Sequence, residues 1–359
     1  MLDEPTTVGS KRMWLPTEPL FEQVLRQLDA GNNLSAEDMR TAILWLLSGE
    51  ATEEQTEKLL MQLAEKGETV EELAGAAQAL RDTMERVERA DGPVVDTCGT
   101  GGDGSKTFNI STAAALVVAG AGVKVAKHGN RKITSSTGSA DVLAELGIDI
   151  DAPTKVVSRC LRELGICFCF APRFHPAMRH VNAVRRSIGR PTIFNRLGPL
   201  ANPALVEHQV LGVGKAEAQP MMAEALQMLG TRRSVVVRGQ DGVDEVSLSA
   251  PTDVLLVTPT AIQPLIWQPA DFGIETASRD ALFADDPASS AACIREVLSG
   301  QYGPKRDVVV LNAASALWAA GRAEDLRSCA RLATESIDSG RAQMVALRLA
   351  QMTTDSNAE

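Results

Sequence analysis

Apolar residues over positions 18–92 recur at the i, i+3, i+4 spacing that places them on one face of a helix. Ser35, Thr52 and Thr69 each stand just before such a stretch, where a hydroxyl can cap the first turn. The pattern predicts a small helical domain over residues 18–92, preceded by a loose tail at residues 1–17. These helices offer few residues for chemistry.

The pattern changes at residue 93, where short apolar runs begin to alternate with helical stretches. Helices are expected over residues 111–121, 139–148 and 155–166. The alternation is typical of an α/β domain with a largely parallel central sheet. In such sheets ligands bind at the carboxyl ends of the strands. The expected strands are residues 93–99, 123–129, 167–172, 191–195, 208–214, 233–239 and 307–312.

The composition of the chain limits the kinds of partner that it could bind. The chain has 359 residues, a net charge of −10 and 4% aromatic residues, which argues against a general affinity for nucleic acid or anionic membranes. No apolar run reaches transmembrane length, and the N-terminus lacks the apolar core of a signal peptide. The six cysteines lack the paired C-x-x-C spacing of zinc sites. We therefore expect a cytoplasmic protein with reduced thiols that binds neither nucleic acid nor membrane.

The stretch DTCGTGGDGSKTFNIST, residues 96–112, joins the first expected strand to an alanine-rich helix. Its glycines at 99, 101, 102 and 104 satisfy the dinucleotide motif G-x-G-x-x-G, and the stretch comes within one residue of the nucleotide P-loop. Glycines let backbone amides approach an anion, and the following helix adds the positive end of its dipole. We expect a phosphate site here; the alternative is a turn that only packs the helix on the sheet.

The residues around this loop fit neither nucleotide motif. A dinucleotide site needs an acidic residue at the end of the second strand, where this chain has KHGNR at residues 127–131. A P-loop needs a lysine directly after its last glycine, where this chain has Ser105. Asp103, inside the loop, would repel a phosphate unless it binds sugar hydroxyls or a metal-bound water. This carboxylate therefore argues against an ordinary nucleotide as the ligand.

Two adjacent carboxylates, Asp244 and Glu245, follow a strand and a glycine turn in RSVVVRGQDGVDEVS. Magnesium is commonly held by one or two carboxylates together with substrate phosphates. A solvated acidic turn is the alternative for such a pair taken alone. Beside a phosphate loop and Lys127, the pair favours a Mg²⁺ site.

Two further segments are rich in polar side chains. In KHGNRKITSSTGSADVL, a basic run and the hydroxyls of Ser135, Ser136, Thr137 and Ser139 precede a helix, which suits a second anion; a plain loop capped by Ser139 would leave the basic run unexplained. In APRFHPAMRHVNAVRRSIG, an arginine that faces a pocket could grip a carboxylate bidentately. Taken singly, each of these arginines is typical of a solvated helix surface. The histidines of this second segment are equally compatible with structural and catalytic roles.

Seven motifs in order, spread over about residues 20–350, resemble the anthranilate phosphoribosyltransferase family. They are GTGGD, NIST, KHGNR, GSADVL, A-P-x-x-H-P-A-M-R-H, F-N-x-L-G-P-L-x-N-P and D-G-x-D-E. Seven linked motifs are far more specific than a single glycine pattern.

The resemblance implies transfer of phosphoribose from phosphoribosyl pyrophosphate (PRPP) to the amine of anthranilate, with Mg²⁺ as cofactor, in tryptophan biosynthesis. It also implies a nucleoside phosphorylase-like fold, in which helices from about 172–190 join the helical domain and residues 93–171 and 191–355 form the α/β domain. A homodimer would form through the helical domain. No single catalytic residue is implied. The residues implied for PRPP are Gly99, Thr100, Gly102, Asp103, Thr107, Asn109, Ser111, Thr112, Lys127 and Ser139; for anthranilate, Gly99, His128, Asn130, Met178 and Arg185; and for the metal, Ser111, Asp244 and Glu245.

The chain departs from the family's usual pattern at four positions. Ser136 replaces a lysine and Lys132 is extra, so the phosphate contacts of that loop are open. Arg196 replaces an apolar residue, and Met178 stands where an aromatic residue is common beside the acceptor, so the acceptor preference is open too. The alternatives are a pyrimidine nucleoside phosphorylase of the same fold, and a nucleic-acid-binding paralogue. The acidic pair disfavours the first, and the net charge of −10 disfavours the second.

Overall fold

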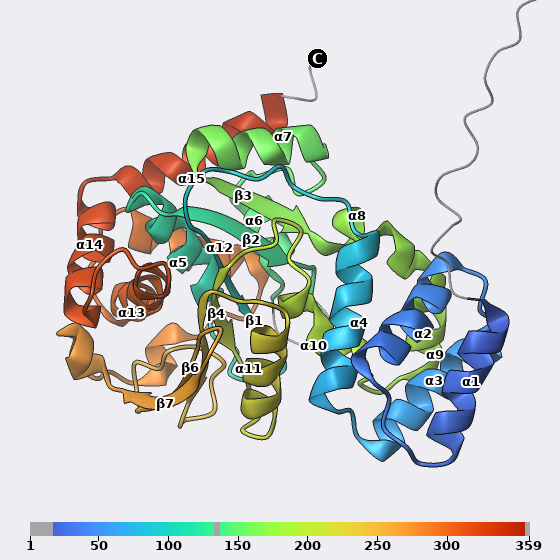
Figure 1. Ribbon diagram of the computed structural model, residues 1–359. Coiled ribbons are helices and arrows are strands. Elements are labelled where there is room, and N and C mark those ends of the chain that lie inside the picture. The colour runs from blue at the N-terminus through green and yellow to red at the C-terminus, as the bar shows by residue number, and fades with distance from the viewer. Residues whose placement is uncertain (1–16, 133–136, 356–359) are drawn as a thin grey trace, which may run out of the picture. The chain divides into compact units, whose positions relative to one another are not determined.

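The computed structural model describes residues 17–132 and 137–355, which fall into two compact units (Figure 1). One unit contains the chain up to Thr83 together with Ala177–Ile193. The other contains Met84–Pro176 and the chain from Phe194 onward. The first unit is helical and the second is built around a β-sheet. The tail expected at residues 1–17 lies, except for Thr17, outside the described residues.

The helical unit begins with α1 (Glu18–Asp29), α2 (Ala36–Ser48), α3 (Glu53–Lys66) and α4 (Val70–Thr83), and the returning segment adds α9 (Arg179–Ile188). The expected caps are present. Ser35 Oγ accepts the Asp38 N–H at 3.1 Å, and Thr52 forms a reciprocal capping box with Gln55. Phe21, Ile43, Leu60 and Leu73 are fully buried, so the apolar faces meet in one core.

The second unit holds a seven-stranded sheet in the order β3-β2-β1-β4-β5-β6-β7. The first five strands in this order are parallel to one another, whereas β6 and β7 run antiparallel to their neighbours. This confirms the largely parallel sheet. The strands are β1 (Val94–Gly99), β2 (Lys124–Gly129), β3 (Ile166–Phe170), β4 (His208–Gly212), β5 (Arg233–Gly239), β6 (Thr252–Val257) and β7 (Ile262–Trp267).

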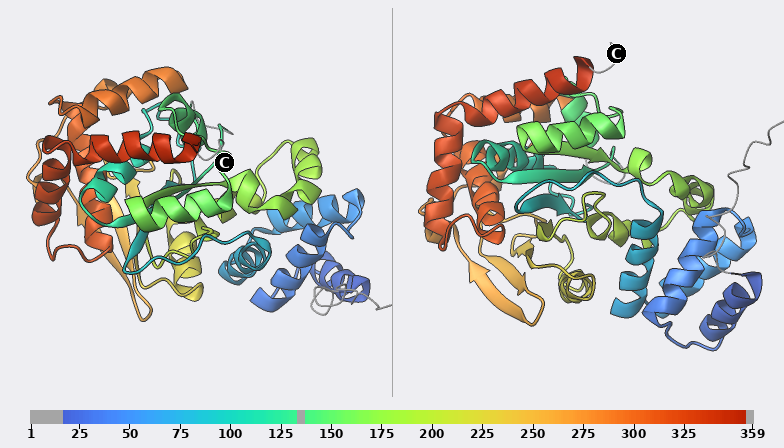
Figure 2. Two further views of the ribbon diagram at one scale, coloured as in Figure 1. Left: turned by 90° about the horizontal axis from the view of Figure 1, so that it is seen from above. Right: turned by 45° about the horizontal axis from the view of Figure 1, so that its top comes forward.

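Helices pack around the sheet, with the apolar helix α5 (Ile110–Gly120) in contact with α13, α14 and α15 (Figure 2). A separate helix, α11 (Ala218–Met228), contacts β5 and β6. The other helices are α6 (Ser139–Glu145), α7 (Thr154–Arg159) continued by a π-helical turn (Cys160–Leu164), α8 (Ala171–Phe174), α10 (Phe194–Leu197), α12 (Pro287–Leu298), α13 (Pro304–Ala319), α14 (Leu326–Asp338) and α15 (Arg341–Thr354). Short 3-10 turns span Pro176–Met178, Gly198–Leu200, Pro269–Phe272 and Arg279–Leu282.

Two expected strands are wrong. Residues 307–312 lie within α13, and residues 191–195 form no strand because α10 begins at Phe194. The run DVVVLN is buried all round, and a fully buried helix shows the same continuous apolar pattern as a buried strand. The antiparallel strands β6 and β7 were not expected from the sequence. Among the described residues no helix is both long and apolar enough to cross a membrane.

Candidate active site

The glycine loop lies between the end of β1 and the start of α5. Gly101, Gly102 and Gly104 have φ values of 67°, 77° and 70°, which side-chain-bearing residues rarely adopt. The Thr100 N–H donates to Gly212 O of β4 at 2.9 Å, and the Gly101 N–H donates to Asp244 Oδ2 at 3.1 Å. The loop is therefore tied to β4 and to the loop after β5.

The second half of the loop is held by its own polar groups and by main-chain hydrogen bonds to residues 282–284. The hydroxyls of Ser105 and Thr107 lie 3.1 Å apart. Asn109 precedes the first residue of α5; its side-chain oxygen accepts the Thr112 hydroxyl, and its N–H donates to Ser290 Oγ at 2.9 Å. These contacts give the N-terminal turn of α5 a defined polar surface. The helix dipole makes that end suitable for an anion.

Lys127 of β2 reaches from its strand to the start of α5. Its side chain is buried, with Nζ donating to Thr97 O of β1 and to Ser111 Oγ at 3.1 Å. Burial lowers the pKa of Lys127, while the negative charges of Asp96 and Glu245 raise it. The sequence placed Lys127 and Ser111 in one site, and the structure brings them into contact.

Three carboxylates converge beside this lysine. Asp103 Oδ2 accepts the Asp244 N–H at 3.4 Å, although the two residues are far apart in sequence. Burial, with the neighbouring Asp103 carboxylate, raises the pKa of Asp244. Burial and the charge of Asp244 raise the pKa of Glu245, which Lys127 partly opposes. The cluster carries concentrated negative charge that a cation would stabilise.

The donor set fits a magnesium ion that shares its coordination with a substrate. Within residues 17–132 and 137–355, no three or more His, Cys, Asp or Glu side chains form a ready-made metal site. Mg²⁺ usually takes one or two carboxylates, several waters and substrate phosphates. Asp244 and Glu245 supply such a pair, and the repulsion that raises their pKa values would be relieved by a dication.

His128, next to Lys127 in β2, belongs to a second part of the site, in which the imidazoles are neutral. Its Nδ1 lies 2.8 Å from Gly198 O, and its ring centroid is 5.1 Å from that of His175. Burial lowers the pKa of His128 to about 4, and burial with the nearby His128 lowers that of His175 to about 3. Both imidazoles are therefore neutral at physiological pH. From the sequence, His175 was equally compatible with a structural role, because no spacing rule links it to His128.

The end of β2 lies close to the start of α6. A Cβ on Gly129 would come within 2.1 Å of Ser139 Oγ, so only glycine fits there. Asn130 O accepts the Ala140 N–H at 3.2 Å, and Arg131 forms an ion pair with Asp141 at 3.2 Å. Part of the basic run thus has a structural role. Thr137 is buried, whereas Ser135 and Ser136, also expected near an anion, lie outside the described residues.

The other two residues expected at the acceptor, Met178 and Arg185, belong to the helical unit. Met178 immediately precedes α9, and Arg185 lies within that helix. Arg185 is half-buried, its Nη1 lies 3.5 Å from Asn182 Oδ1, and burial lowers the pKa of its guanidinium. In the sheet unit, Arg196 of α10 is half-buried as well.

The fold and these residues define a glycosyltransferase. A model of the glycosyl transferase family a/b domain matches residues 91–343, and a model of the family's helical bundle domain matches residues 22–84. The chain belongs to this family, and within it to the anthranilate phosphoribosyltransferases.

The assignment to the anthranilate phosphoribosyltransferases rests on relatives and solved structures. The anthranilate phosphoribosyltransferases of Rhodopirellula baltica and Symbiobacterium thermophilum are each 48% identical to this chain. The alignments cover 92% and 94% of this chain, and 97% and 99% of the relatives. The crystal structure of the Thermus thermophilus enzyme matches with a TM-score of 0.86 at 39% identity, covering 92% of this chain and 99% of that chain. The Saccharomyces cerevisiae enzyme in complex with PRPP and Mg also has a TM-score of 0.86, at 29% identity, covering 94% and 99%.

These comparisons confirm the family, the fold class and the enzyme class expected from the sequence motifs. They favour neither the pyrimidine nucleoside phosphorylase nor the nucleic-acid-binding paralogue.

Proposed function

We propose that this chain transfers phosphoribose from PRPP to the amine of anthranilate and releases pyrophosphate, as a step of tryptophan biosynthesis. The observation that carries the proposal is the convergence of a glycine loop, a buried lysine and three carboxylates at the carboxyl ends of β1, β2 and β5. The names of the relatives and the PRPP complex of the yeast enzyme support the choice of substrates.

The sugar diphosphate would bind over the glycine loop and the start of α5. Backbone amides of the loop and the dipole of α5 would face the phosphates, and Lys127 would add a positive charge. Asp103 is suited to the ribose hydroxyls, because a carboxylate accepts their hydrogen bonds. The full proposed set is Gly99, Thr100, Gly102, Asp103, Thr107, Asn109, Ser111, Thr112, Lys127 and Ser139.

Asp244 and Glu245, with Ser111, would hold Mg²⁺. When bound, the ion supplies positive charge that makes pyrophosphate a better leaving group. The Mg-containing yeast structures support this assignment.

In the reaction, the C1–O bond to pyrophosphate breaks as the amine nitrogen forms its bond to C1, and the amine then loses a proton. The loop amides and Lys127 stabilise charge that develops on the departing phosphate. An aromatic amine is nucleophilic without a strong base, so much of the rate would come from holding the two substrates in line. Because burial lowers the pKa of His128 to about 4, it would meet the acceptor as a neutral imidazole.

We propose that Gly99, His128, Asn130, Met178 and Arg185 recognise anthranilate, with Arg185 taking the carboxylate. A half-buried guanidinium suits bidentate binding of a planar carboxylate. Arg185→Ala is expected to raise the KM for anthranilate about 10-fold or more, while the KM for PRPP changes less than about two-fold. Arg185→Lys, which keeps the charge but loses the planar fork, should recover only part of this loss. Equal changes in both KM values would contradict the assignment.

We also propose a homodimer formed through the helical unit, and a cytoplasmic location. Leu20 of α1 is 49% exposed, so a charge can be introduced there to test an apolar contact without disturbing the core. The six cysteines are free thiols, which suits a reducing compartment. Analytical ultracentrifugation of the wild type and Leu20→Glu tests the dimer: the variant should sediment as a monomer.

The activity itself is tested by following the loss of anthranilate fluorescence with PRPP and Mg²⁺. Turnover that requires all three components is expected. No turnover, together with phosphorolysis of thymidine or uridine, would overturn the proposal in favour of a nucleoside phosphorylase.

A further inference from the structure

Strands β1 and β2 are joined differently along their length. Their ladder pairs Val94 with Lys124 and Val95 with Val125, at the amino ends of the strands. By contrast, β1 pairs with its other neighbour, β4, at every position over residues 95–99. Towards the carboxyl end, where the site lies, the connection between β1 and β2 runs through side chains.

Asp96 and Asn202 make two of these connections. The Asp96 carboxylate accepts the His128 N–H at 3.2 Å through Oδ1 and the Asn202 Nδ2 at 2.7 Å through Oδ2. Asn202 Nδ2 also donates to Ala126 O of β2 at 2.7 Å. Asn202 is itself fixed, because its Oδ1 accepts the Ala204 N–H at 2.9 Å. Asp96 is 0% exposed and Asn202 is 3% exposed, so water cannot replace these contacts.

Lys127 lies between the two residues that this pair holds in β2, Ala126 and His128. Its ammonium reaches across to β1, where it donates to the main-chain oxygen of Thr97, the residue after Asp96. It also donates to Ser111 Oγ. The carboxylates of Asp96 in β1 and of Glu245 face this ammonium, and the nearby Cys98 thiol stays neutral because burial raises its pKa well above its usual range. Asp96 therefore fixes the backbone on one side of Lys127 and also supplies a buried counter-charge.

We propose that Asp96 and Asn202 are positioning residues for PRPP binding: they bridge β1 and β2 at their carboxyl ends and keep the Lys127 ammonium against Thr97 and Ser111. The inference rests on the proposed role of Lys127 at the sugar diphosphate. Neither residue touches the glycine loop in the contacts above, and their effect is transmitted through Lys127 and the main chain of β2. A carboxylate is required at position 96, because it must accept two hydrogen bonds, one of them from an amide NH₂ group.

Asp96→Asn tests the proposal with almost no change in shape. The new amide would place its NH₂ group against the NH₂ group of Asn202. The negative charge opposite Lys127 would also be lost. The KM and the calorimetric Kd for PRPP are expected to rise about 10-fold, while the KM for anthranilate stays within about two-fold. Asn202→Ala removes the other member of the pair. Because the two residues act through one network, the double variant Asp96→Asn/Asn202→Ala should lose no more PRPP affinity than the weaker-binding single variant.

Gln219→Met is the matched control. Gln219 Nε2 also bridges two main-chain carbonyls of neighbouring strands, Val236 O and Asp253 O, each at 2.9 Å, but it makes no contact with Lys127. This variant should lower the melting temperature and leave both KM values unchanged.

The outcomes separate this inference from the proposed function. Wild-type protein that neither binds nor uses PRPP would overturn the proposed function. If the wild type is active, two results would overturn the positioning role: an Asp96→Asn variant that changes only the melting temperature, or losses of PRPP affinity in Asp96→Asn and Asn202→Ala that add up in the double variant. A selective loss of PRPP affinity in both single variants that does not add up in the double variant would support it.

Discussion

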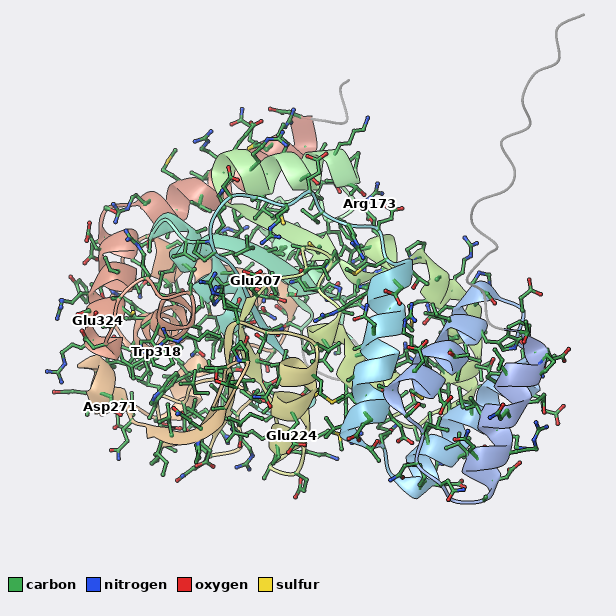
Figure 3. All side chains as sticks on the ribbon, in the orientation of Figure 1. Arg173, Glu207, Glu224, Asp271, Trp318 and Glu324 are labelled. Carbon is green, nitrogen blue, oxygen red and sulfur yellow. The ribbon has the colours of Figure 1, made fainter. Side chains whose placement is uncertain are left out.

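Charged residues are arranged very differently at the two ends of the sheet. At the amino ends of β4 and β5 there is a cavity of about 680 Å³, lined by residues that include Arg89, Glu207 and Arg233. Glu207 is labelled in Figure 3. Arg89 pairs with Glu207 at 3.4 Å, with the side chains 87% and 45% exposed, and Arg233 lies 3.9 Å from the ring centroid of Trp318. These charges are paired or stacked, and water reaches most of them.

At the carboxyl ends, the charges are concentrated in a buried lysine and three half-buried carboxylates. Lys127 is only 3% exposed, and burial raises the pKa values of Asp244 and Glu245. The comparison teaches that a large cavity does not by itself mark the chemistry. Charged groups that are costly to desolvate are a better indication of the site. Proteins commonly keep such groups where a ligand interacts with them.

The largest expected effect is at the carboxylate pair. Asp244→Ala with Glu245→Ala should lower Mg²⁺-dependent turnover by about 1000-fold, because the ion would lose both carboxylate ligands. The matched change at the amino end, Asp91→Ala with Glu207→Ala, should leave turnover within about two-fold. Steady-state rates across a Mg²⁺ titration measure both. Similar losses in the two double variants would remove the distinction between the ends.

A single methyl group should be enough to disturb the carboxyl end. A Cβ on Gly99 would come within 2.5 Å of Asp244 Oδ2, so Gly99→Ala is expected to displace that carboxylate and lower kcat/KM about 10- to 100-fold. Gly92, at the amino-end cavity, has open space around it but a φ of 79°. Gly92→Ala should therefore cost about 1 kcal/mol of stability and leave kcat/KM unchanged. The prediction fails if Gly99→Ala retains full activity.

The buried histidines give the carboxyl end a pH dependence of stability. A folded pKa of about 3 for His175 lies below its usual value of about 6.5, so its stabilising contribution is complete above pH 6.5 and is lost as the pH falls. Between pH 7.5 and 5.5 the wild type should lose about 1 kcal/mol more stability than His175→Gln. Thermal or urea unfolding at the two pH values measures this difference. Parallel pH curves for the two proteins would show that His175 is not held neutral by burial.

The smallest effect is expected at the amino end. Arg233→Met removes the guanidinium from the Trp318 ring and should lower stability by about 1 kcal/mol, with kcat and both KM values unchanged. Urea unfolding and steady-state kinetics check the two parts. A change in KM would show that the amino end communicates with the site.

Local features of the fold could be predicted well from the sequence. The caps at Ser35 and Thr52 depend on residues three positions apart, and the five parallel strands follow from compact apolar runs. The errors came where the local pattern is ambiguous. Residues 308–311 of the run at 307–312 are all apolar and buried, and they lie in α13, which packs against α5 and α14.

The site was predictable in its residue types and only partly in its contacts. The order of the motifs identified four residues as candidate members of the site: Asp103, Lys127, Asp244 and Glu245. It could not indicate Asp96 or Asn202, because their role depends on where two strands separate.

By itself, then, the sequence determined the family, the helix caps and the residues available for chemistry, since these depend on identity and short spacing. Only the tertiary structure decided which charges meet. Asp103 contacts Asp244 and Asp96 contacts Asn202 because parallel strands bring distant segments of the chain to one edge of the sheet. Burial at that edge then raises the pKa values of Asp96 and Asp244, since desolvation depends on everything packed around a group and not on its neighbours in sequence.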